Sequence, residues 1–187
     1  MVRLAVSSLL AALALNVVGA VLDVAHAQSR LIGTATVPEK LPYDIPYGPP
    51  LTLAQARKII DAAEAEARRR HWQYAVAVVD SAGNLLSCDK MDDTQLSSLA
   101  IAEAKARASA QFRRPTKAMQ DAVSNGATAV LSIPGILAGE GGIPIVIDGK
   151  LVGAVGASGG AGVQDSVIAQ AGAAAASASA PGSASAE

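Results

Sequence analysis

The spacing of apolar residues predicts a helix followed by a β-hairpin in the first half of the chain. Apolar positions recur at helical spacing from Leu53 to Ala67, and Thr52-Leu53-Ala54-Gln55 has the pattern of a capping box at the helix start. The apolar run Tyr74–Val79 and the segment Leu85–Lys90 flank residues 80–84, whose sequence Asp-Ser-Ala-Gly-Asn is typical of a turn. These two segments are therefore expected to pair as antiparallel strands.

Two further helices are expected in the middle of the chain. One should run from about Thr94 to Gln111 and end before Arg114, because Pro115 follows and disfavours helical geometry in the residue before it. A shorter helix is expected from Pro115 to about Ser124, since proline is favoured at the first helical position. Residues 126–142 are predicted to form a Gly- and Ser-rich connection. The buried face of the longer helix is predicted to consist of Leu96, Ala100, Ala104 and Ala108.

A second hairpin and a last helix complete the pattern. Ile143–Ile147 and Leu151–Val155 flank Asp148-Gly149, a strong signal for a tight turn. Gly156–Gly162 is expected to form a flexible loop before a helix over Asp165–Ala175. Because hairpins dominate, the predicted fold class is α/β of the α+β kind, with a largely antiparallel sheet and packed helices. A doubly wound nucleotide-binding fold would instead require alternating strands and helices.

The two ends of the chain have compositions unlike the middle. Residues 1–27 begin with a positive charge, continue with an apolar stretch and end in Ala-His-Ala, the three parts of a secretory signal peptide. Cleavage after Ala27 would give a periplasmic or secreted protein with no remaining membrane span. Residues 28–50 are expected to be a Pro-rich N-terminal arm, 51–175 one domain, and 176–187 a disordered Ala/Ser tail.

Composition excludes several classes of function. The formal net charge is −1, which disfavours a nucleic-acid partner because such proteins present a strongly basic face. The one cysteine, Cys88, cannot form a disulfide within the chain and is interpreted as a small, half-buried strand residue. His71 is the one histidine left after the predicted cleavage. No Cys/His zinc cluster and no Ser/His/Asp grouping can therefore be proposed.

A series of short motifs, in order along residues 51–175, resembles the GlcG/HbpS family. Any one of them is a weak signal, whereas the ordered series is specific. The motifs are Val76–Leu85, Lys90-Met91-Asp92-Asp93, Lys105-Ala106 with Phe112 and Pro115-Thr116, Gly141–Ile145, Gly149–Gly156, and Ser158-Gly159 with Asp165, Ala169 and Ala171-Gly172.

This resemblance implies a profilin-like or PAS-like fold that often assembles into homo-oligomers. It also implies haem as a cofactor, since some members bind haem and some extracellular members sense or degrade it. A related domain lies at the C-terminus of some corrinoid adenosyltransferases, and many members have no settled activity. The function expected for this chain is therefore haem binding outside the cytoplasm, for sensing, scavenging or degradation.

The expected haem site combines cations with an apolar slot. Arg113, Arg114 and Lys117 lie beside Phe112 and Thr116 and could bind the haem propionates; the alternative, a solvated helix end, stays open. The family motifs add Lys90, Met91, Asp92, Gly141 and Gly142 to the predicted cofactor-binding set. No axial ligand, catalytic residue or metal ligand is assigned. His71 is interpreted as a chain-turning surface residue; the remaining candidate ligands are Met91, Met119, Tyr43, Tyr47, Cys88, Lys90 and Thr116.

A second hypothesis comes from a different class of function. The poor supply of haem ligands, together with the loops Lys90–Asp93 and Glu140–Gly142, is compatible with a small-molecule enzyme. The same features suit an accessory subunit of an exported oxidoreductase. Whether the protein is an enzyme stays open, and in an enzyme of this kind Asp92 would be a candidate acid or base.

Overall fold

The computed structural model describes residues 38–178 of the chain. The predicted signal peptide and most of the predicted tail lie outside these residues, although residues 176–178 continue the last helix. Residues from Pro42 onward belong to one compact unit. Its elements are α2 (Leu53–Arg69), β1 (Ala75–Asp80), β2 (Leu85–Lys90), α3 (Ser98–Phe112), α4 (Thr116–Ser124), the 3-10 helix η1 (Thr128–Ser132), β3 (Gly142–Ile147), β4 (Lys150–Ser158) and α5 (Gly162–Ala178).

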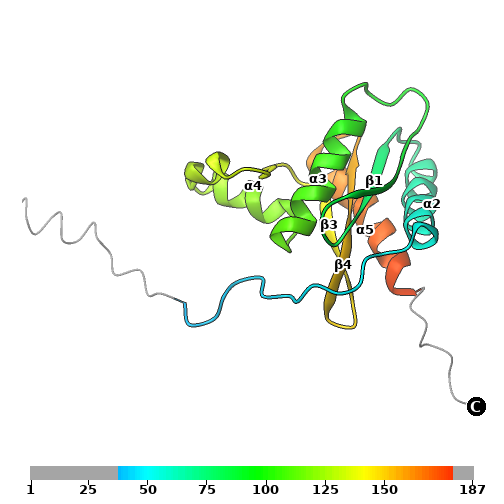
Figure 1. Cartoon of the computed structure of the whole chain (residues 1–187). Coiled ribbons are helices and arrows are strands. Elements are labelled where there is room, and N and C mark those ends of the chain that lie inside the picture. Colours follow the sequence, from blue (N-terminus) through cyan, green and yellow to red (C-terminus); the bar gives the residue numbers. More distant parts are fainter. Residues whose placement is uncertain (1–37, 179–187) are drawn as a thin grey trace, which may run out of the picture. The chain divides into compact units, whose positions relative to one another are not determined.

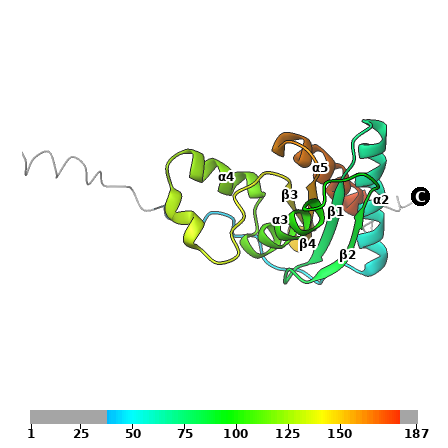
Figure 2. The ribbon, with the colours of Figure 1, turned by 90° about the horizontal axis from the view of Figure 1, so that it is seen from above.

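The two predicted hairpins meet in one four-stranded sheet with the order β2-β1-β4-β3 (Figure 1). Every neighbouring pair is antiparallel, with β1 and β4 in the centre and β2 and β3 at the edges. Helix α3 packs on one face of the sheet, and α2 and α5 pack on the other (Figure 2). The α+β prediction is therefore confirmed.

Strand β1 shows how the two faces are filled. Its side chains alternate, because successive residues of a strand point to opposite sides of the sheet. Val76 and Val78 join the main apolar core with α2 and α5, whereas Ala75, Ala77 and Val79 pack in two smaller clusters that include residues of α3. The alanine-rich face lets α3 lie close to the sheet.

The predicted buried face of α3 is wrong. The helix begins at Ser98 because residues 91–97 form turns, in which the Thr94 hydroxyl donates to the Tyr74 carbonyl at 3.2 Å. Leu96 is 92% exposed, Ala100 is exposed and Ala104 is only half-buried, although Ala108 is buried as expected. The buried stripe contains Ala102, Lys105, Ala106, Ser109 and Ala110.

Two glycines of the sheet determine which side of α3 is buried. A Cβ built on Gly156 would overlap the carbonyl oxygen of Ala102, and one built on Gly142 would overlap the carbonyl oxygen of Lys105. The backbone of α3 therefore contacts β4 and β3 directly. Any residue other than glycine at positions 156 and 142 would prevent this contact. Gly156 and its neighbours up to Ser158 belong to β4 and not to the predicted loop.

Two connections differ from their prediction. The connection over residues 126–142 contains η1, which together with α4 projects away from the sheet (Figures 1 and 2). The arm pairs with β4, since Leu151 donates its N–H to the Pro46 carbonyl at 2.8 Å and accepts from the Gly48 N–H at 2.7 Å.

Within residues 38–178, no helix is both long and apolar enough to cross a lipid bilayer.

Candidate functional site

The predicted cofactor-binding residues fall into two groups, one directly after β2 and the other around the α3–α4 junction, which contacts the start of β3. Lys90 ends β2, with Met91 and Asp92 directly after it, whereas Gly142 begins β3 and contacts α4. Three strand spacings separate the two edge strands, which corresponds to roughly 14 Å. The two groups therefore do not form one pocket around a single small ligand.

The group at the C-terminal end of α3 contacts the arm. Arg113 follows the helix with φ +53°, a left-handed conformation that turns the chain. Its Nη1 donates to the Ile45 carbonyl at 3.0 Å, and its guanidinium lies 5.5 Å from the centre of the Tyr47 ring. The guanidinium of Arg114 lies 4.1 Å from the centre of the Tyr43 ring. We call these four side chains, Tyr43, Tyr47, Arg113 and Arg114, the arm cluster.

The arm cluster combines features that suit a flat, dianionic ligand. Each guanidinium has five N–H donors, and each forms a single hydrogen bond within residues 38–178: Arg113 to the arm, and Arg114 to the Phe112 carbonyl at 3.0 Å. Tyr43 and Tyr47 are 40% and 51% exposed, and Phe112, the last residue of α3, is half-buried. Lys117 is exposed on α4 and paired with Asp121 at 2.6 Å. Two guanidinium groups and two partly exposed aromatic rings therefore lie together on this surface.

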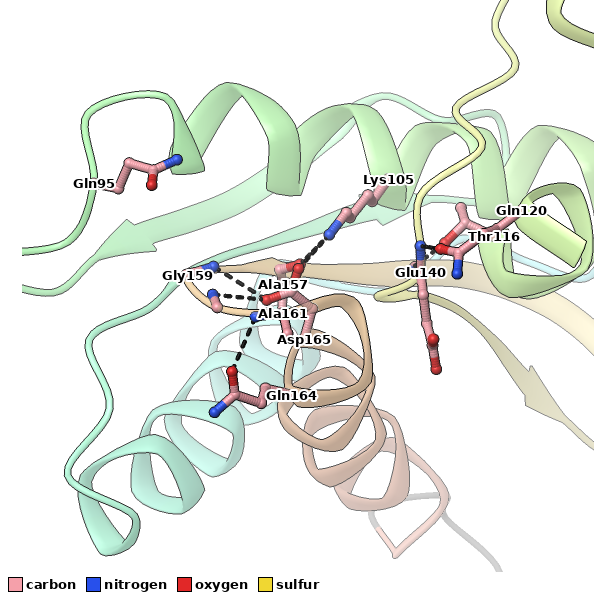
Figure 3. A network of polar contacts seen from close by, with 12 residues as sticks. Gln95, Lys105, Thr116, Gln120, Glu140, Ala157, Gly159, Ala161, Gln164 and Asp165 are labelled. Carbon is pink, nitrogen blue, oxygen red and sulfur yellow. Dashed lines mark hydrogen bonds and ion pairs between the residues drawn. The ribbon is translucent and has the colours of Figure 1, made fainter. Parts of the chain in front are cut away.

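An interior network joins α3, α4, α5 and the sheet (Figure 3). The ammonium of Lys105 lies 2.5 Å from Oδ2 of Asp165, with side-chain exposures of 6% and 4%. The other oxygen of Asp165 accepts from the N–H groups of Gly159 and Gly160 at 3.2 and 3.1 Å. Sequence reasoning missed this ion pair: Lys105 and Asp165 are both in the motif series, and Asp165 is a candidate acid/base carboxylate or a helix-start residue, but nothing in the sequence pairs the two.

Thr116 extends the network to β3. It is fully buried, and its hydroxyl accepts from the Gly142 N–H at 2.9 Å. Gln120, one turn further along α4, accepts from the Glu140 N–H at 2.9 Å. Gly141 has φ +120°, and a Cβ there would lie 2.6 Å from the Asp165 Cβ. These contacts give Thr116, Gly141 and Gly142 structural roles, and their cofactor role stays a prediction.

The second group borders an open, charged depression of about 500 Å³. Met91 is half-buried, packs against the main core and donates its N–H to the Tyr74 carbonyl at 3.0 Å. Within the described range, no three His, Cys, Asp or Glu side chains gather as a metal site. The depression is lined by Glu64, Arg68, Gln73, Asp89, Lys90, Met91, Asp92 and Asp93.

A smaller cavity of about 310 Å³ lies beside this depression; we call it the sheet-end pocket. Tyr74 lines it and is 1% exposed, and its hydroxyl has no hydrogen-bond partner in the described part of the chain. Burial, together with the nearby Asp165 carboxylate, raises the pKa of Tyr74 far above its usual value, so the hydroxyl stays protonated. The pocket is lined by Trp72, Gln73, Tyr74, Asp93, Thr94, Gln95, Gly159, Gly160 and Gln164.

The remaining candidate iron ligands are scattered. His71 is exposed at φ +57° directly after α2, which matches its interpretation as a chain-turning residue. Met119 is buried in α4 at 2% exposure. Cys88 is half-buried in β2, as predicted, and burial raises the pKa of its thiol, which disfavours the thiolate that binds metals.

Comparison with known proteins identifies a matching family model and several similar proteins. The family model "Haem degrading protein HbpS-like" matches residues 51–174. Protein GlcG of Escherichia coli K12 is 42% identical over 108 residues, which cover 58% of this chain and 81% of GlcG.

Two solved structures share the fold. A double mutant of HbpS from Streptomyces reticuli is 30% identical, with a TM-score of 0.64 over 75% of this chain and 96% of its own. A complex of PduOC with haem is 28% identical, with a TM-score of 0.61 over 67% of this chain and 94% of its own. The match to the family model, together with these relatives, shows that the chain belongs to the HbpS-like family.

Proposed function

We propose that this protein is an exported haem-binding protein and that the arm cluster, with Phe112, holds the haem edge. The observation that carries the proposal is membership of a family described as haem-degrading, with a haem complex among the similar structures. The arm cluster supports the location, because it brings two arginines and two tyrosines from distant segments to one partly exposed surface.

The arginines would hold the propionates. A planar guanidinium binds a carboxylate through two parallel N–H groups, and such charge-assisted hydrogen bonds are about twice as strong as neutral ones. The Arg113 side chain is 31% exposed and lies 3.7 Å from the exposed Asp44, a weak ion pair that a propionate could replace. The rings of Tyr43, Tyr47 and Phe112 offer apolar surface to the porphyrin.

Tyr43 and Tyr47 are the candidate iron ligands at this place, because tyrosine is one of the side chains that hold haem iron in proteins. The Tyr47 hydroxyl donates to the Gln111 carbonyl at 3.2 Å, so this ring is oriented before any ligand binds. Bound haem would supply an iron centre whose surroundings decide between binding, sensing and degradation. Met91 follows β2 and packs against the main core, so we leave it out of this proposed site.

The test is a titration of the purified full chain with haemin, followed by the Soret absorbance. Wild type should give a saturable, sharpened Soret band, and Arg113→Ala/Arg114→Ala should weaken binding at least about tenfold, the loss expected for one charge-assisted hydrogen bond or more. Arg68→Ala/Arg69→Ala is the matched control, since it removes two exposed arginines of α2 and should bind as wild type does.

Two results would contradict the proposal. A Soret curve equal to that of haemin in buffer would remove haem as the ligand. Wild-type affinity in the Arg113→Ala/Arg114→Ala variant would remove the arm cluster as the site. Tyr43→Phe and Tyr47→Phe assign the ligand: the variant that lacks it should shift the position of the Soret band while the arginines still hold the haem.

Export and self-assembly are separate parts of the proposal. The pattern of residues 1–27 supports cleavage after Ala27, and the family resemblance supports a homo-oligomer in the periplasm or medium. Expression of the full gene, cell fractionation and N-terminal sequencing should find a mature protein that begins at Gln28. Light scattering of that protein should give a mass above one chain; a mass of one chain would contradict the oligomer.

A further inference from the structure

The sheet-end pocket lies at the other end of α3 from the arm cluster. Helix α3 has 15 residues and is therefore about 22 Å long. The pocket is bordered by Thr94 and Gln95 before the start of α3, whereas the arm cluster follows its last residue, Phe112. A ligand in the pocket would thus occupy a site separate from the proposed haem site.

The Tyr74 hydroxyl is the first sign of a ligand. Buried polar groups are nearly always hydrogen-bonded, and an unpaired one is costly. Gly160, which also lines the pocket, packs directly against this hydroxyl, since a Cβ there would lie 2.7 Å from the hydroxyl and 2.6 Å from Oε1 of Gln164. The hydroxyl, which is protonated, can donate one hydrogen bond and accept others.

The charge of the pocket restricts the class of ligand. Its lining contains no lysine and no arginine, and Asp93 is its one carboxylate. The Lys105 ammonium behind it is already paired with Asp165, whose carboxylate also accepts from the Gly159 and Gly160 N–H groups. Arg70, which stacks on Trp72 at 5.0 Å, is paired with Glu66. Anions therefore find no counter-charge here. The one carboxylate, Asp93, is exposed, so an ion pair with it would gain a cation too little to offset the loss of its hydration.

Size and surface chemistry restrict the ligand further. A volume of about 310 Å³ equals that of roughly ten water molecules, which suits a molecule no larger than a monosaccharide. Three glutamine amides, the Tyr74 hydroxyl and the Thr94 hydroxyl line the wall, and the Trp72 indole adds an apolar surface with one N–H donor. Such a wall matches a ligand rich in hydroxyl groups.

We propose that the sheet-end pocket binds a small, uncharged, polyhydroxylated molecule of up to monosaccharide size, with the Tyr74 hydroxyl and the Gln95 amide among its hydrogen-bond partners. This site is additional to haem binding and does not depend on it. It borders the loop Lys90–Asp93, which the motif series singled out and which haem binding at the arm cluster does not use.

Trp72 reports on this pocket, because it is the one tryptophan in the sequence. The test titrates the haem-free full chain with glycerol, D-ribose and D-glucose, and follows tryptophan fluorescence. At least one of the three should give a saturable change. D-gluconate and protonated D-glucosamine, which are similar in size but charged, should bind at least about tenfold more weakly than the best neutral probe.

Variants separate specific binding from a general solvent effect. Tyr74→Phe should weaken binding about fivefold, the loss of one hydrogen bond. It should fold as wild type does, because the hydroxyl it removes has no hydrogen-bond partner within residues 38–178. Gln95→Ala changes an exposed lining residue and should also weaken binding, whereas Gln170→Ala, an exposed amide on α5 outside the pocket, should not.

Three outcomes would overturn the proposal. The first is the absence of a saturable change with all three neutral probes. The second is equal or tighter binding of gluconate or glucosamine, which would mean that the charge argument is wrong. The third is wild-type affinity in both Tyr74→Phe and Gln95→Ala, which would place the bound molecule elsewhere near Trp72.

Discussion

The interior network and the arm cluster use the same kinds of charged group under opposite conditions. The side chains of Lys105 and Asp165 are 6% and 4% exposed. The Asp165 carboxylate contacts Lys105 and the N–H groups of Gly159 and Gly160, all within the fold. The side chains of Arg113 and Asp44 are 31% and 71% exposed, and their ion pair at 3.7 Å is weak enough for another anion to replace Asp44. Charges in the interior therefore hold elements together, whereas charges on the arm remain available to a ligand.

The largest effect should follow from breaking the interior ion pair. Lys105→Met leaves the buried Asp165 carboxylate without its counter-charge, which typically costs about 3–5 kcal/mol of unfolding free energy. Urea denaturation followed by circular dichroism measures this loss. Lys105→Met/Asp165→Asn removes the orphan charge but keeps an oxygen for the Gly159 and Gly160 N–H groups, so it should be more stable than the single variant. Equal stability of the two variants would mean that lost packing, and not the unpaired charge, causes the loss of unfolding free energy.

The close approach of α3 to β4 should show the next largest effect. Gly156→Ala places a methyl group against the backbone of Ala102 and 2.6 Å from the Ala106 nitrogen, and overpacking of this kind costs about 3 kcal/mol. Gly139→Ala is the control, since its new methyl would meet the end of the Leu137 side chain at 3.0 Å and the Lys105 Cε at an ordinary contact distance of 3.8 Å, and no backbone atom. Similar losses in both variants, by the same denaturation, would mean that this contact does not fix α3.

A single buried hydrogen bond should count for less. Thr116→Val preserves the shape of the side chain but leaves the Gly142 N–H without an acceptor, at a cost of about 1–3 kcal/mol. Thr116→Ser keeps the hydroxyl and should lose less. If thermal unfolding shows the opposite order, the methyl contact and not the hydrogen bond joins α4 to β3.

The arm cluster should contribute little to stability. Arg113→Ala/Arg114→Ala removes two cation–π contacts and one exposed ion pair, together worth about 1 kcal/mol. Urea denaturation at low and high salt should give a small loss that shrinks with salt. A loss as large as that of Lys105→Met would abolish the distinction between the two regions.

The smallest effect is expected at a surface cluster on α2. Hydrogen bonds from Arg69 and Arg70 lower the pKa of Glu66 from 4.5 to about 2. A carboxylate with a lowered folded pKa stabilises the fold above its unfolded pKa and loses that effect as pH falls toward 2. Glu66→Gln should therefore melt slightly below wild type at neutral pH, and the two melting curves should converge as pH falls from about 4.5 to about 2. A gap that persists at pH 2 would have a non-ionic cause.

The sequence was sufficient for elements that carry their own local signals. Thr52 and Gln55 form the predicted capping box, and Asp148-Gly149 closes the predicted hairpin. Asp80 accepts from the N–H groups of Ala82 and Asn84, as its place in a turn suggested. Such signals act within a few residues, so periodicity and turn chemistry are enough to find them.

Long-range features were not accessible in the same way. Lys105 and Asp165 are sixty residues apart, and the alanine-rich α3 has no apolar stripe strong enough to say which face is buried. The buried face is chosen by glycines on the partner strands, which only the assembled sheet brings opposite α3. Likewise Tyr43 and Arg114 were each singled out, but the arm has no periodicity that could predict their contact.

The pairing of the arm with Leu151 has a consequence for any shortened version of this protein. A chain that begins at Leu51 would match the family boundary but would lack Pro46 and Gly48. The Pro46 carbonyl accepts from the Leu151 N–H, and the Gly48 N–H donates to the Leu151 carbonyl. The start of β4 would then present unpaired backbone groups on an open edge, a template for pairing with other chains. An expression boundary set N-terminal to Pro42 should avoid the aggregation that the domain boundary itself invites.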